Sequence, residues 1–197
     1  MLPQSHAVIS GLIYQDVQQA LGVTLNKKQL TYGSIKPDIY SGIPKLKHFK
    51  PQSFVPICHQ IAKIASTQTE GNHQAIERLS QKIGIVTHYV ADYFSVPHND
   101  RATYHHHILA HIKYETQLHH MFIHSMLERK FSLTNEYLDF SNVEHVMNYL
   151  DELHLIYSSR SESYLNDLNS SAYAARSVAS LIVRQTLTAA PSKEIAA

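Results

Sequence analysis

The sequence predicts a single all-α domain over residues 1–190, followed by a frayed tail over residues 191–197. Along most of the chain apolar residues recur at intervals of three and four, which is the period of helices that bury one face. No segment shows the sustained alternation of apolar and polar residues that predicts a strand. With 197 residues, the chain has the length of one compact domain with its own core.

The helices are predicted in order from their apolar stripes and their end signals. The first begins at Ser5, a residue type that caps helix N-termini. Two glycines and three prolines interrupt the pattern in residues 31–53, which therefore predict a long structured loop. Further helices are predicted over residues 53–66, 72–96, 103–130, 142–167 and 171–190. Ser141 and Glu144 have the spacing of a capping box at the start of the fourth of these.

Charge and composition exclude several classes of protein. Seventeen basic and sixteen acidic residues give a formal charge of +1, which is far from the basic balance of a dedicated nucleic-acid binder. No run of 18 residues lacks a charge, which excludes an ordinary transmembrane helix. Cys58 is the only cysteine, so an internal disulfide is excluded. The first lysine is Lys27, so a basic signal segment is absent and a cytoplasmic location is expected.

Histidine is the residue in excess, with fifteen copies against sixteen carboxylates. His88 and Asp92 are four residues apart on an apolar helix face, where a lone carboxylate would cost several kcal/mol to desolvate. His111 and Glu115 repeat this spacing within a stripe that should face the core. Residues four apart share a face of a helix, so both members of each pair can reach one metal ion. Together with His98 between them, the pairs predict a site for zinc or a related metal.

These residues resemble the central ligand run of the zinc-dependent phospholipase C family, whose all-helical fold is shared with the single-strand-specific zinc nucleases. The run reads His88-x3-Asp92-x5-His98-x12-His111-x3-Glu115. Three upstream features extend the resemblance: the segment Gly33-Ser-Ile-Lys-Pro-Asp38 resembles the loop with the family's essential aspartate, His48 falls at a loop histidine ligand, and His6 resembles the histidine of the first helix.

The resemblance implies two to three zinc ions per chain. It implies one ion held by His48, His88 and Asp92, and a second held by His98, His111 and Glu115. His6 would help to hold a third ion, to which Asp92 bridges. Asp38 would be a ligand or the base that orients the attacking water, and the implied substrate is a phospholipid or another phosphodiester.

One departure and two alternatives bear on this interpretation. Secreted members of the family use the amine and carbonyl of an N-terminal tryptophan at the third zinc, and this chain has no tryptophan. Either the Met1 amine reaches the site, or the third site is incomplete or supplied differently. A nuclease or nucleotide phosphodiesterase on the same scaffold stays open, as does a non-catalytic metal-binding protein. An HD-type phosphohydrolase is excluded because no histidine is followed directly by aspartate.

Overall fold

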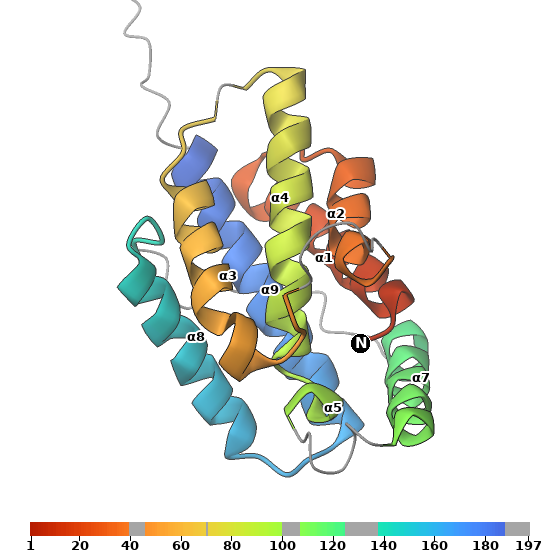
Figure 1. Cartoon of the computed structure of the whole chain (residues 1–197). Helices are drawn as coiled ribbons and strands as arrows, with labels where there is room; N and C mark the ends of the chain where they lie inside the picture. The colour runs from red at the N-terminus through yellow and green to blue at the C-terminus, as the bar shows by residue number, and fades with distance from the viewer. Residues whose placement is uncertain (40–45, 70, 100–106, 125–137, 188–197) are drawn as a thin grey trace, which may run out of the picture.

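The structure is a computed structural model that describes residues 1–39, 46–69, 71–99, 107–124 and 138–187 (Figure 1). These residues form helices and no strands, so the predicted all-α fold is confirmed. The predicted tail, residues 191–197, lies outside the described residues. In chain order the helices are α1 (Pro3–Leu21), α2 (Lys27–Ile39), α3 (Lys50–Ala65), α4 (His73–Asp92), α5 (Val96–Asn99), α7 (Ile108–His124), α8 (Val143–Ser158) and α9 (Tyr164–Leu187).

Helix α9 is the central element of the bundle. Alanine and serine supply many of its side chains, and most of its length is buried because helices α1, α3, α4, α7 and α8 pack around it (Figure 1). Small side chains allow several neighbours to approach one helix closely. Arg176 of α9 and Asp16 of α1 form a buried, bidentate ion pair across one of these contacts. None of the described helices is long and apolar enough to cross a membrane.

The predicted loop over residues 31–53 is wrong in its first part, because helix α2 continues to Ile39, and at its end, because helix α3 begins at Lys50. Pro37 and Gly33 both lie inside this helix. Gly33 has a packing role: a Cβ there would overlap the backbone of Gln81 in α4, and a Cβ at Gly84 of α4 would overlap the Leu30 carbonyl of α2. The two glycines therefore allow the backbones of α2 and α4 to touch where they cross.

Two of the predicted helices are divided in the structure. The helix predicted over residues 72–96 corresponds to α4, which ends at Asp92, and the short helix α5 then begins at Val96. The range 142–167 breaks after Ser158, and α9 begins at Tyr164. The Ser163 hydroxyl accepts a hydrogen bond from the Asn166 amide, which caps the start of α9. Apolar spacing does not report hydrogen bonds of this kind.

Two predicted helix starts also shift. Helix α1 begins at Pro3 rather than at Ser5, since proline fits the first turn of a helix, where its missing N–H costs nothing. At the start of α8 the side chain of Asn142, not Ser141, accepts the backbone N–H of Glu144. The helix predicted over residues 103–130 is described as α7, and its two predicted ends lie outside the described residues.

Candidate metal centre

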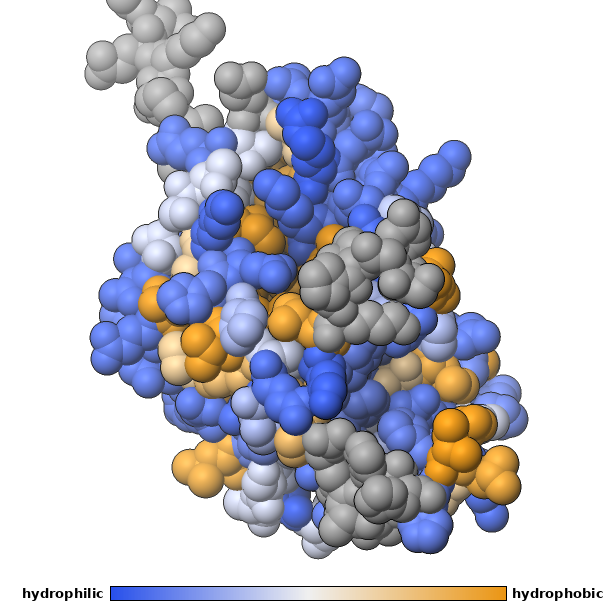
Figure 2. Space-filling view, in the orientation of Figure 1, coloured by the Kyte–Doolittle hydropathy of each residue, from blue (hydrophilic) through white to orange (hydrophobic). Residues whose placement is uncertain are grey.

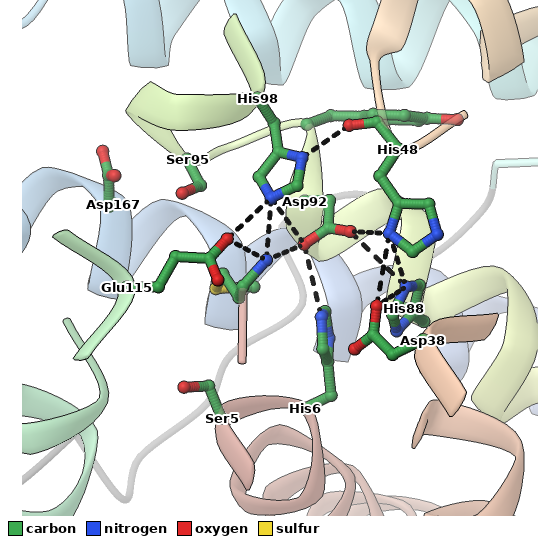
Figure 3. A network of polar contacts seen from close by, with 12 residues as sticks. Ser5, His6, Asp38, His48, His88, Asp92, Ser95, His98, Glu115 and Asp167 are labelled. Atoms are coloured by element: carbon green, nitrogen blue, oxygen red, sulfur yellow. Dashed lines mark hydrogen bonds and ion pairs between the residues drawn. The ribbon is translucent and has the colours of Figure 1, made fainter. Parts of the chain in front are cut away.

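All of the predicted ligand residues lie together, close to the amino end of the chain. Figure 3 labels each of them except His111. They come from several elements: His6 from α1, Asp38 from α2, His48 from the segment before α3, His88 and Asp92 from α4, His98 from α5, and His111 and Glu115 from α7. The two pairs with four-residue spacing therefore meet each other, although they belong to different helices.

A first group of ligand atoms consists of Asp38 Oδ1, His48 Nδ1, His88 Nε2 and Asp92 Oδ2. His48 Nδ1 lies 2.9 Å from Asp92 Oδ2, and it lies 3.1 Å from His88 Nε2. Asp38 Oδ1 lies 3.5 Å from His48 Nδ1 and 3.7 Å from His88 Nε2. A tetrahedral zinc ion with bonds of about 2.0–2.1 Å separates its ligand atoms by roughly 3.3 Å. The spacing of this group is therefore suited to one such ion.

Hydrogen bonds on the outer side of two rings determine which nitrogen faces the centre. His88 Nδ1 donates to the carbonyl oxygen of Ser34 over 2.7 Å. His98 Nδ1 donates to the carbonyl oxygen of His48, also over 2.7 Å. In a neutral ring the proton then sits on Nδ1, and the lone pair of Nε2 points into the centre. Both rings thus have the tautomer and orientation that a metal ligand requires.

A second group consists of His98 Nε2, His111 Nε2 and Glu115 Oε1, which all lie within 4.8 Å of one another. Glu115 Oε1 lies 2.7 Å from His111 Nε2 and 3.1 Å from His98 Nε2. The His111 side chain is 29% exposed, whereas the Glu115 side chain is 10% exposed. This group therefore lies at the solvent edge of the centre.

The amino group of Met1 lies between the two groups. It donates to Asp92 Oδ1 over 2.6 Å and lies 3.1 Å from Glu115 Oε1. Burial alone would lower the pKa of this amine, but the charges of Asp92 and Glu115 outweigh burial and raise it to about 10. The ammonium group thus balances the charge of the carboxylates, as a metal ion would.

Two buried atoms of the centre have no hydrogen-bond partner among the described residues, namely His6 Nε2 and Asp38 Oδ2. His6 Nε2 lies 3.3 Å from Asp92 Oδ1, without hydrogen-bond geometry. An unpaired buried polar atom costs about 1–3 kcal/mol, and a bound cation would remove that cost for an imidazole nitrogen. Imidazoles and carboxylates without thiolates suit zinc. The residues present therefore fit a cluster of metal ions.

Burial and charge set the protonation of the innermost ligands. Desolvation would raise the pKa of Asp92, but His98, the Met1 ammonium and other neighbours hold it well below its usual value. Burial, followed by the charge of His6, lowers the pKa of His88 well below its usual value. Burial raises the pKa of Asp38. An ionised Asp92 and a neutral His88 are the forms in which these side chains bind metals.

Asp167 of α9 supports the centre and is a residue to which sequence reasoning assigned no role. Its carboxylate accepts hydrogen bonds from the Val96 amide over 2.8 Å, from the Tyr114 hydroxyl over 3.0 Å and from the Tyr157 hydroxyl over 2.9 Å. Asp167 thereby holds the start of α5, which carries His98. The helix predicted over residues 142–167 ends at Asp167, and nothing in that local pattern connects this residue to Val96.

A family model described as zinc dependent phospholipase C matches residues 5–164 of the chain. This span contains every predicted ligand residue from His6 to Glu115. It ends at the first residue of α9, so most of the central helix lies beyond it. No curated protein and no solved structure gives a significant match.

Proposed function

Since the chain belongs to the zinc-dependent phospholipase C family, we propose that it hydrolyses the phosphodiester bond of phospholipids at this centre, with two to three zinc ions. The observation that supports the proposal best is the position of Asp92, whose two oxygens face separate sets of ligands. Asp92 Oδ2 belongs to the first group, while Oδ1 faces His6 and the Met1 amine. A carboxylate placed in this way is suited to bridge two ions.

Each set of residues has a separate role in this proposal. His48, His88 and Asp92 would hold one ion, and His98, His111 and Glu115 would hold a second. The proposal gives the third position to His6 and Asp92, with the Met1 amine as the further donor. When bound, zinc supplies Lewis acidity that activates water and neutralises the phosphate oxygens during in-line attack.

Asp38 is the proposed base. Its Oδ1 atom faces His48 and His88, whereas its buried Oδ2 atom has no hydrogen-bond partner among the described residues. One oxygen can therefore stay with the ligand group while the other orients the attacking water and accepts its proton. A positioned general base contributes about 10²–10⁴-fold to the rate of such a step.

The substitution Asp38→Asn tests this role, because asparagine keeps an oxygen for the ligand group but cannot take up the proton. We expect turnover to fall at least about 100-fold, while the zinc content per chain stays close to that of the wild type. Zinc would be measured by elemental analysis, and turnover with a short-chain phosphatidylcholine dissolved as monomers. A parallel loss of zinc and turnover would make Asp38 a ligand rather than the base.

The substrate class is tested on the unmodified protein, purified without a metal-affinity column. We expect two to three equivalents of zinc and hydrolysis of phosphatidylcholine in preference to single-stranded nucleic acid. The opposite preference would support a nuclease on the same scaffold. Full zinc content without turnover of lipid, nucleic acid or small phosphodiesters would support a metal-binding protein without catalytic activity.

A further inference from the structure

The first turns of α7 carry an apolar patch that the proposed chemistry does not use. Ile108 is 71% exposed, Leu109 is 80% exposed and Ile112 is 49% exposed. Figure 2 shows hydrophobic side chains gathered over this end of α7, at the lower right of the view. Single exposed aliphatic residues are ordinary on protein surfaces, whereas three neighbouring ones form a contiguous patch. We name Ile108, Leu109 and Ile112 the α7 patch.

The α7 patch adjoins the solvent edge of the metal centre. Ile108 lies three residues before His111, and Ile112 lies three residues before Glu115. Residues three apart are neighbours on a helix surface, so the patch runs along the side of α7 next to its two ligands. His111 is the ligand of the second group with the largest exposed fraction. A surface that contacts the α7 patch would therefore also approach the entrance of the centre.

The charges on α7 indicate what kind of surface fits the patch. Glu115 is the only acidic residue within Ile108–His124, and it is buried. Lys113, His120 and His124 are exposed on the same helix. Lys113 is the only lysine or arginine of α7, so the helix exposes aliphatic side chains, one cation and neutral polar groups, and no carboxylate. This combination is compatible with the headgroup region of a lipid bilayer.

We propose that the α7 patch docks on the surface of a phospholipid bilayer and holds the entrance of the metal centre against it. This inference rests on the proposed function, which places the substrate in such a surface. A second copy of the chain fits less well, because a stable dimer interface buries about 800 Å² on each partner and involves roughly 20–30 residues a side. Lys113 beside the apolar residues instead matches a surface of phosphate groups above hydrocarbon.

The test compares two matched double variants. Ile108→Ser with Leu109→Ser removes most of the α7 patch, whereas Leu155→Ser with Ile156→Ser removes two other exposed aliphatic residues, from α8. Binding to vesicles of phosphatidylcholine and phosphatidylglycerol would be measured by sedimentation. Hydrolysis would be measured on the same vesicles and on monomeric short-chain phosphatidylcholine. Circular dichroism and thermal unfolding would verify that both variants fold.

We expect the α7 variant to bind vesicles at least about tenfold more weakly than the wild type, because removing buried aliphatic side chains lowers partitioning. Its hydrolysis of the monomeric substrate should stay within about twofold of the wild type. The α8 variant should match the wild type in both assays. Unchanged vesicle binding of the α7 variant, or equal losses in both variants, would overturn the docking proposal.

The assays also separate this inference from the proposed function. Vesicle binding requires no turnover, so it decides the docking proposal even for an inactive protein. Hydrolysis of the monomeric substrate requires no bilayer, so its absence in the wild type would contradict the proposed function alone. A wild-type dimer that the α7 variant abolishes, with vesicle binding unchanged, would assign the patch to a second copy and overturn lipid docking.

Discussion

At the scale of single residues, the amino group of Met1 shows how a buried site balances its charge. It lies 2.6 Å from Asp92 Oδ1 and 2.8 Å from His98 Nε2, with the Met1 side chain fully buried. A charged group in such surroundings is stable only when it is paired with opposite charge. Deprotonation would turn the same nitrogen from a counter-ion into a donor for a metal.

Moving this amino group is expected to weaken the centre. Two glycines added before Met1 would replace the ammonium with a peptide nitrogen, which cannot bind a metal in the same way. We expect elemental analysis to find about one zinc ion fewer per chain than in a control protein with the same residues added at the C-terminus. Equal zinc contents in the two proteins would show that the amine is not a ligand.

Asp167 has unusual acid–base behaviour for an aspartate. Burial raises the pKa of its carboxyl from 3.8 to about 6, although hydrogen bonds from its neighbours, the Val96 amide foremost, act in the opposite direction. A carboxyl with a higher pKa in the folded state favours folding when it is protonated. Its contribution is complete below about pH 3.8 and is lost as the pH rises through about 6.

The substitution Asp167→Asn should remove this dependence on pH, since asparagine does not ionise. Relative to the wild type, the variant's free energy of unfolding should rise by roughly 2 kcal/mol between about pH 4 and about pH 7. Urea unfolding of both proteins at several pH values provides the measurement, and comparison in identical buffers cancels what the other groups contribute. If the free energies of unfolding of the two proteins changed in parallel with pH, a raised pKa of Asp167 would be contradicted.

At the scale of elements, the contact between α2 and α4 positions much of the first ligand group. Asp38 lies near the end of α2, and Ser34 of the same helix holds the His88 ring of α4. Gly33, directly before Ser34, and Gly84, four residues before His88, allow the two backbones to meet next to these residues. Any side chain larger than hydrogen at this crossing would push apart the two helices that bring Asp38 to His88.

The substitution Gly84→Ala is therefore expected to be harmful despite the better helix propensity of alanine. Its Cβ would overlap the backbone of Leu30, and overpacking of this kind costs about 1–3 kcal/mol. We expect a lower free energy of unfolding in urea together with a lower zinc content.

Gly11→Ala in α1 is the matched control, since a Cβ there meets no atom within 4 Å. Helix propensity alone should leave this variant as stable as the wild type or more stable by up to about 1 kcal/mol. If the two alanine variants lost stability and zinc to the same extent, close packing at Gly84 would not explain the loss.

At the scale of the whole molecule, the centre connects segments that are distant in the chain. Its residues extend from Met1 to Glu115. They come from α1, α2, α4, α5 and α7 and from the segment before α3. A ligand that binds only the folded state stabilises every element that contributes to its site. Zinc should therefore act on global unfolding and not on one helix.

Removal of zinc by a chelator is expected to lower the midpoint of thermal unfolding, and added zinc should restore it. At free zinc concentrations of about 100 times the dissociation constant, each site contributes about 2.7 kcal/mol. Thermal unfolding followed by circular dichroism, with magnesium as the control ion, measures the effect. An identical midpoint with chelator and with zinc would contradict a metal cluster that links these helices.

The parts of the fold and site that were predictable from the sequence are those that depend on neighbours in the chain. Apolar spacing determined the all-α class, because helix periodicity is local. The spacing of four in His88–Asp92 and in His111–Glu115 determined which side chains share a helix face. The resemblance added His6, Asp38 and His48, and the structure brings all of them to one place.

The remaining features depend on contacts between distant segments, and only the tertiary structure decided them. Gly33 and Pro37 indicate a loop by local rules, yet packing against α4 keeps that stretch helical. The tautomers of His88 and His98 depend on carbonyl groups more than forty residues away. Asp167 reaches Val96 only because α9 runs through the middle of the bundle. Spacing along the chain determines which groups share a face, whereas packing determines which faces meet.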